Sequence, residues 1–149
     1  AMLAAEEGYR QLIWTDAIEH KYIEEAGTMN VIFIINNVLV TPISGDTILN
    51  GITKKSVLEI AKDWGIEIQE RKIEVEEILN ALKSGSLTEA FGAGTAATIA
   101  PISNISLNGE NFIIPESRPD HFHVKVLEYL SKYKRGEVQD KFNWLEVLN

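Results

Sequence analysis

Two segments of the sequence combine glycine with threonine in a way that suits the binding of a phosphorylated ligand. One is FGAGTAATIAP at 91–101, in which Ile99 is the only large side chain between the two ends. Small side chains allow the backbone to approach another group closely. The other is Gly51-Ile52-Thr53, at the start of an expected helix, where free N–H groups and the helix dipole attract phosphate. Both segments are therefore candidates for holding an anion.

Each segment also has a simpler interpretation. Residues 92–97 fit G-x-G-x-x-A, the fingerprint of dinucleotide-binding proteins, but that fingerprint requires a helix directly after it. Pro101 followed by Ile102 favours a strand instead, so a glycine-rich strand or a tight turn is the better interpretation of this motif. A threonine near a helix start is also common in helices that bind nothing.

Acidic and histidine residues offer two further candidates. Glu24 and Glu25, next to Gly27, could pair with a cationic ring nitrogen or act as a base, although such pairs are usually solvated. His121 and His123 could be metal ligands, but no cysteine or carboxylate stands at a diagnostic spacing from them. We expect both histidines to be surface residues at a helix start, and we predict no metal site.

Composition limits the class of protein. The chain has 149 residues, 45% of them hydrophobic, which fits one globular domain. Its net charge of −8 argues against a nucleic-acid or anionic-membrane partner. It contains no cysteine, no apolar run long enough to span a membrane and no signal peptide at its start, so we expect a cytoplasmic protein.

Hydrophobic periodicity predicts a mixed α/β fold. Strands are expected at 11–14, 31–35, 38–40, 66–73, 102–107 and 111–115. Turns at Asn36-Asn37 and Asn108-Gly109 predict two hairpins. Helices are expected around 52–64, 75–82 and 126–133, ending at Gly65, Gly85 and Gly136. Hairpins beside β-α-β passages indicate a mixed sheet with packed helices.

Four segments together resemble one enzyme family. EEAGTMN at 24–30, Thr41-Pro42, ILNGIT at 48–53 and EAFGAGTAA at 89–97 have the order and spacing of the fold-type IV pyridoxal-phosphate enzymes. HKYIEEAGTMN and FGAGTAATIAP resemble the branched-chain amino-acid aminotransferases most, over about residues 12–144. Another fold-type IV enzyme, a D-amino-acid aminotransferase or an aminodeoxychorismate lyase, is the alternative. The resemblance implies the large domain of this fold, a mixed sheet or pseudo-barrel with packed helices.

The resemblance also implies roles for particular residues. It places Glu25 opposite the pyridine nitrogen of pyridoxal 5'-phosphate, where a carboxylate keeps the nitrogen protonated. The remaining implied cofactor contacts are Leu49 on the ring face and Gly51, Ile52, Thr53 and Thr95 at the phosphate. The implied substrate contacts are Thr28, Thr95 and Ala96.

Some positions depart from the family pattern. Asn50 stands where a proline is usual, and Ile43 where a second proline is frequent. Ala97 and Ala100 occupy the places of the Cys-x-x-Cys pair that some relatives carry, so we expect no thiol regulation there.

The family's cofactor-binding lysine lies in a Gly-Asn-Tyr-Ala context upstream of the GTMN loop, and no lysine of this chain has that context. We therefore expect residues 1–149 to be the large C-terminal domain, without the small N-terminal domain and without a catalytic residue of its own.

The implied parent enzyme is a cytoplasmic homodimer that moves amino groups from leucine, isoleucine or valine to 2-oxoglutarate. Its partners are branched-chain amino acids and 2-oxo acids. The chain alone is expected to be inactive. A noncatalytic binding or assembly module derived from the fold is the other alternative.

Overall fold

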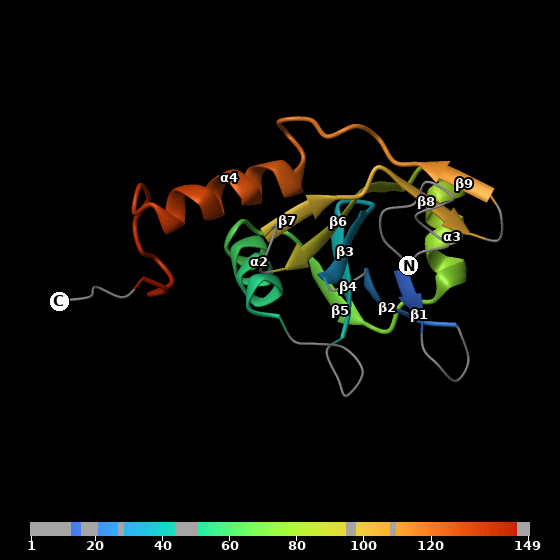
Figure 1. Ribbon diagram of the computed structural model, residues 1–149, viewed down its shortest axis with the longest axis horizontal. Coiled ribbons are helices and arrows are strands. Elements are labelled where there is room, and N and C mark those ends of the chain that lie inside the picture. The colour runs from blue at the N-terminus through green and yellow to red at the C-terminus, as the bar shows by residue number, and fades with distance from the viewer. Residues whose placement is uncertain are drawn as a thin grey trace, which may run out of the picture.

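The computed structural model describes residues 13–15, 21–26, 29–43, 51–94, 98–107 and 110–145. Its strands are β1 (Ile13–Thr15), β2 (Ile23–Ala26), β3 (Met29–Ile35), β4 (Val38–Pro42), β5 (Ile68–Arg71), β6 (Leu87–Gly94), β7 (Thr98–Pro101), β8 (Asn104–Leu107) and β9 (Glu110–Ile113). Its helices are α2 (Ile52–Asp63), α3 (Val75–Ser84) and α4 (Phe122–Lys134). The predicted mixed α/β fold is confirmed (Figure 1).

Strand β3 organises the seven-stranded sheet. It pairs with β2 near its start and with β4 near its end, and β6 pairs with it along its length, all antiparallel. Beyond these strands, β5 joins β4 in parallel and β7 joins β6 antiparallel. Because α2 connects the parallel strands β4 and β5, the sheet combines a β-α-β unit with hairpins, as the sequence predicts.

The sheet separates two hydrophobic cores. Because side chains alternate along a strand, Val31 and Phe33 of β3 face one side and Ile32 and Ile34 face the other. The first pair packs with α3 and with residues of the β8–β9 hairpin, and the second packs with α2 and α4. Figure 1 shows α3 and the hairpin on one side of the sheet, with α2 and α4 on the other.

Local turn chemistry explains several boundaries. Asn36 and Asn37 have φ of 51° and 63°, the positive values that a two-residue hairpin turn requires. Gly65, Gly85 and Gly136 also have positive φ and follow the three described helices. The predicted first hairpin and the three predicted helix ends are therefore confirmed.

The structure bears on several other expectations. Glu24 and Glu25 lie within β2, and the strand expected within residues 66–73 is confirmed as β5. Residues 98–101 form β7 instead of a helix, so the dinucleotide fingerprint lacks its required context. The hairpin β8–β9 is present, while its Asn108-Gly109 turn lies outside the described residues. None of the described helices combines the length and the apolar character needed to cross a membrane.

Candidate functional site

Segments far apart in the sequence meet where β3 begins. Asn30 in β3 pairs with Glu25 in β2 and with Ala93 in β6, and Ala93 pairs in turn with Ile99 in β7. Glu25, Asn30, Ala93 and Ile99 therefore form one row across four strands. The row brings the backbone of the predicted acidic residue to the end of the sheet where the glycine-rich strand β6 terminates.

The start of α2 lies against this row. Gly51 is the N-cap residue of α2, and a Cβ atom placed on it would lie 2.5 Å from Oδ1 of Asn30. A separation below 3 Å is too short for any real side chain, so only glycine fits here without movement. The buried Asn30, 6% exposed, therefore lies directly against the N-terminus of α2.

The small residues of β6 make a second close approach. Cβ atoms placed on Gly92 and Gly94 would lie 2.8 Å and 2.7 Å from side-chain atoms of Met29. The Met29 side chain therefore occupies the space that the glycines leave. For Gly92 and Gly94, the structure supports the interpretation of a glycine-rich strand packed against a neighbour.

The N-terminus of α2 is electrostatically suited to an anion. Its first turn contains no acidic residue, its N-cap residue Gly51 has no side chain to offer, and among the described residues none is seen to cap its first N–H groups. In contrast, α3 has Glu76 and Glu77 in its first turn, and Glu89 accepts hydrogen bonds from the first amides of α4. Within the described part of the chain, α2 is thus the helix whose N-terminus meets no carboxylate, which suits it to an external anion.

Lys54 also lies in this region, and no sequence motif assigns it a role. Its side chain is 1% exposed, and its Nζ donates to the carbonyl oxygen of Pro42 at 2.7 Å and pairs with Glu70 at 2.8 Å. Pro42 ends β4 and Glu70 lies in β5. The lysine therefore anchors the first turn of α2 to the parallel strand pair, and its charge is satisfied within the protein.

The structure describes only some of the predicted site residues. Glu25 lies in β2, Gly51 caps α2, Ile52 is the exposed first residue of α2 and Thr53 is half-buried. Leu49, Thr28, Thr95 and Ala96 lie outside the described residues. The structure thus brings the backbone of Glu25 and the start of α2 to one end of the sheet, and their roles toward a ligand stay predictions.

The histidines require a clear correction. His121 and His123 are 7% and 5% exposed, so they are buried rather than surface residues. Glu89 of β6, also 5% exposed, completes a group whose ligand-type atoms lie within 4.8 Å of one another. Nothing in the sequence points to this carboxylate, because it lies more than 30 residues from the histidines and reaches them only through the fold.

Hydrogen bonds determine the protonation state of Glu89 in this second group. Glu89 Oε1 accepts from the amide of His123 at 2.9 Å and lies 2.6 Å from its Nδ1, and Oε2 accepts from the amide of Phe122 at 3.1 Å. Burial by itself would raise the pKa of Glu89. The hydrogen bonds from His123 and Phe122 outweigh burial and hold the pKa of Glu89 below its ordinary value. Glu89 is therefore ionised at neutral pH and caps α4.

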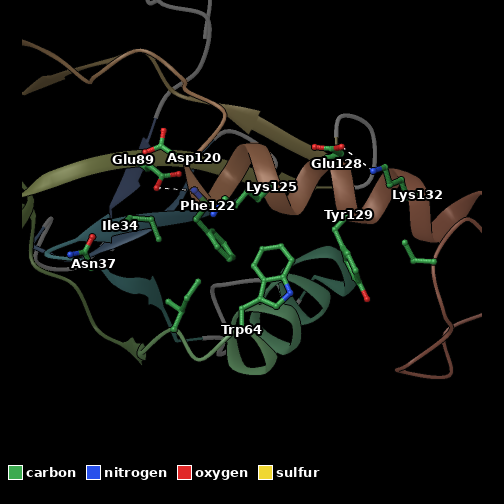
Figure 2. Close-up of a pocket in the computed structure, with 12 residues that line it drawn as sticks. Ile34, Asn37, Trp64, Glu89, Asp120, Phe122, Lys125, Glu128, Tyr129 and Lys132 are labelled. Atoms are coloured by element: carbon green, nitrogen blue, oxygen red, sulfur yellow. Dashed lines mark hydrogen bonds and ion pairs between the residues drawn. The ribbon is translucent and has the colours of Figure 1, made fainter.

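A groove of about 750 Å³ runs beside this group (Figure 2). It is lined by Ile34, Asn37, Trp64, Ile66, Glu89, Asp120, Phe122, Lys125, Glu128, Tyr129, Lys132 and Val138. Figure 2 shows Glu89 and Asp120 close to the start of α4, with the Trp64 ring beside α2. Among the described residues that line the groove, none is predicted by the sequence to bind a cofactor.

Comparison with known proteins identifies the class. Residues 1–105 match the family described as amino-transferase class IV, and the chain belongs to that family. Branched-chain-amino-acid transaminase 1 of Bacillus subtilis is 40% identical over 141 residues, which are 95% of this chain and 40% of the relative. Branched-chain-amino-acid aminotransferase 2 of the same organism is 42% identical over 142 residues, or 95% of this chain and 39% of the relative.

Solved structures agree with this assignment. The branched-chain amino acid aminotransferase from Escherichia coli superposes with a TM-score of 0.79 at 29% identity, covering 99% of this chain and 46% of that one. A second branched-chain amino acid aminotransferase, complexed with N-(5'-phosphopyridoxyl)-L-glutamate, gives a TM-score of 0.78 at 25% identity, covering 99% and 45%. The resemblance inferred from the sequence is confirmed. The chain spans about 40% of the length of the curated relatives it matches.

Proposed function

We propose that this chain is the part of a branched-chain amino-acid aminotransferase that holds the phosphate and the ring nitrogen of pyridoxal 5'-phosphate. The observation that carries the proposal is the N-terminus of α2, which has no acidic residue in its first turn and begins at Gly51, a residue with no side chain to cap it. Family membership and the 40% identical transaminase support the substrate class. The phosphopyridoxyl ligand of the second solved aminotransferase supports the cofactor.

The residues present fit such a cofactor. Gly51 brings the first amides of α2 beside the end of β3, and its lack of a side chain is enforced by Asn30 at 2.5 Å from a would-be Cβ atom. In the proposal, the amides of Ile52 and Thr53 and the Thr53 hydroxyl bind the phosphate dianion. Thr95 adds a second hydroxyl donor, and Leu49 packs against the ring.

Glu25 has a different task in the proposal. Its backbone pairs with that of Asn30, which borders the start of α2. A carboxylate at the pyridine nitrogen keeps that nitrogen protonated, and Glu25 holds the proton there. The bound cofactor supplies the electron-withdrawing ring that lets an amino group move between an amino acid and a 2-oxo acid. Thr28, Thr95 and Ala96 orient the carboxylate of the amino acid.

Residues outside this chain complete the activity in the proposal. The cofactor-binding lysine is expected upstream of the GTMN loop, so residues 1–149 bind the cofactor without a covalent bond and do not turn over alone. We also propose that the enzyme is a cytoplasmic homodimer. Light scattering of the protein with its native flanking sequence tests the dimer, and a monomer at micromolar concentration contradicts it.

Titration with pyridoxal 5'-phosphate tests the phosphate site. Thr53→Ala removes one hydroxyl donor to an anion and should weaken binding about tenfold, since a hydrogen bond to a charged group contributes roughly 1.5–3 kcal/mol. Ser56→Ala is the matched control, because Ser56 lies in the same helix and its hydroxyl donates to the carbonyl of Ile52. It should leave the dissociation constant unchanged.

The natural protein, with whatever sequence flanks this chain, should transfer the amino group of leucine to 2-oxoglutarate, measured as glutamate formed. If the parent, Thr53→Ala and Ser56→Ala proteins bind pyridoxal 5'-phosphate equally well, the proposed phosphate site is contradicted. Bound cofactor with transfer only from D-amino acids points to the other fold-type IV enzymes. Absence of cofactor binding in the natural protein favours the noncatalytic module.

A further inference from the structure

We propose that Glu89, His121 and His123 form a binding site for Zn²⁺ or a neighbouring first-row transition-metal dication. The three residues are buried, and each offers one ligand-type atom within 4.8 Å of the others. The site lies near the start of β6 and at the start of α4, whereas the proposed cofactor site lies near the end of β6. The inference does not depend on the proposed function.

Topology brings the three side chains together. His121 is the N-cap residue of α4 and His123 lies in its first turn, so the two imidazoles are neighbours, with ring centroids 5.6 Å apart. Glu89 reaches them from β6 because its carboxylate binds the amides of Phe122 and His123. The same hydrogen bonds that cap the helix therefore hold a carboxylate against two histidines.

In the proposed site the metal ion takes the place of the proton between His123 and Glu89. Nδ1 of His123 and Oε1 of Glu89 are 2.6 Å apart, which is the separation of two groups that share a proton. An ion in the place of that proton binds both atoms. Nε2 of His123 then carries the ring hydrogen and donates it to Oγ of Ser117, now 2.8 Å away. An outer acceptor of this kind orients most metal-binding histidines.

The adjustments needed are small. Ligand atoms of a tetrahedral zinc ion lie roughly 3.3 Å apart, given bonds of about 2.0–2.1 Å. The distance between Oε1 of Glu89 and Nδ1 of His123 must therefore increase from 2.6 Å. The ring nitrogen of His121, within 4.8 Å of the other ligand-type atoms, must come closer by rotation of its side chain. The Nδ1 atom of His121 accepts one long hydrogen bond, 3.3 Å from the amide of Arg118, which this rotation would break. Oε2 of Glu89 keeps its hydrogen bond from the amide of Phe122, so the helix cap is retained.

An ion has a route to the site from solvent. Glu89 and Asp120 both line the groove beside α4 (Figure 2), so a hydrated cation reaches Glu89 through the groove and keeps one water as its fourth ligand. Two imidazoles and one carboxylate suit Zn²⁺, Co²⁺ or Fe²⁺, whereas Mg²⁺ prefers an all-oxygen shell. The bound ion would fasten α4 to β6.

Metal titration of the natural protein tests the inference after dialysis against a chelator. We expect Zn²⁺ to bind one to one by calorimetry and Co²⁺ to give the visible absorption of a tetrahedral complex, with no response to Mg²⁺. His121→Ala should weaken Zn²⁺ binding at least tenfold. His20→Ala is the matched control, since His20 is the remaining histidine of the sequence, and it should bind as the parent does.

A second variant distinguishes the loss of a metal ligand from misfolding of the protein. Glu89→Gln retains a carbonyl acceptor for α4 but loses the charged ligand, so it should stay folded by circular dichroism and bind Zn²⁺ at least tenfold more weakly. The inference is overturned if Zn²⁺ shows no saturable binding, because the trio is then a hydrogen-bonded helix cap alone. It is also overturned if His121→Ala and Glu89→Gln bind as tightly as the parent, or if only His20→Ala loses binding.

Discussion

At the scale of single residues, Lys54 shows how a charged side chain is accommodated in the interior. The carbonyl of Pro42 and the carboxylate of Glu70 both receive its ammonium group. Glu70 is 37% exposed, so water screens the ion pair on one side. The carbonyl of Pro42 depends on the lysine more strongly, because a buried acceptor without a donor is destabilising.

Replacing Lys54 should therefore destabilise the protein. Lys54→Met keeps most of the side-chain volume but removes the donor, and we expect the free energy of unfolding to fall by about 1–3 kcal/mol. Urea unfolding followed by circular dichroism measures the change. Lys55→Met alters an exposed lysine in the same turn and should change stability by less than about 0.5 kcal/mol. Similar losses in the two variants would refute the anchoring role of Lys54.

At the scale of elements, the segment after α4 folds back onto the helix, and the carboxylate of Asp140 accepts several of the hydrogen bonds that hold it there. Asp140 accepts hydrogen bonds from the hydroxyl of Tyr133 in α4 and from the amides of Trp144 and Leu145. Beside these bonds, the rings of Phe142 and Trp144 stack with centroids 4.5 Å apart. Asp140 thus contributes to holding residues 140–145 against α4, together with the amide of Phe142, which donates to the Tyr133 hydroxyl, and the Lys141–Asp63 ion pair.

The docking of this segment should depend on pH. The hydrogen bond from Tyr133, opposed by partial burial and helped by the backbone amides, holds the pKa of Asp140 below its ordinary value. A carboxyl group whose pKa is lower in the folded state stabilises that state at pH above its unfolded pKa of about 3.9. The stabilisation is lost as the pH falls through the depressed folded pKa.

Tryptophan fluorescence between pH 7 and pH 2 measures this loss. We expect an acid step in the parent protein, and Asp140→Asn, which cannot ionise, should show the acid-type signal already at pH 7 and lack the step. Asp120→Asn changes an exposed carboxylate before α4 and should retain the step. An unaltered acid step in Asp140→Asn would show that another group is responsible.

At the scale of the whole molecule, the sheet is shared by two cores. Phe33 lies in the core beneath α3 and Phe91 in the core beneath α2 and α4, and both are fully buried. The two residues lie on directly paired strands, β3 and β6. Because each core needs the same strands, neither is expected to unfold while the other remains intact.

Matched substitutions on the two faces test this coupling. Phe33→Leu and Phe91→Leu should each lower the free energy of unfolding by about 1–2 kcal/mol, as expected for a modest loss of buried volume. In both variants, fluorescence and circular dichroism should follow one coincident urea transition. Two separate transitions in either variant would mean that the cores fold independently.

Features that depend on interactions between neighbouring residues could be predicted from the sequence. The hairpin at Asn36-Asn37 and the three helix ends were predicted because a few neighbouring residues determine them, through positive φ values that asparagine and glycine tolerate. The mixed sheet followed from hydrophobic periodicity. The family resemblance followed from four short motifs, and comparison with known aminotransferases confirms it.

Contacts between distant residues were decided only by the tertiary structure. The burial of Lys54 depends on Pro42 and Glu70, and the contact of Gly51 with Asn30 depends on how α2 crosses the sheet. The histidines looked like surface residues in sequence, because an alternating pair at a helix start is usually solvated. Glu89 lies on a strand more than 30 residues away. Local spacing carries no information about such a partner, so only the packing of α4 against β6 could bring the carboxylate and the two imidazoles together.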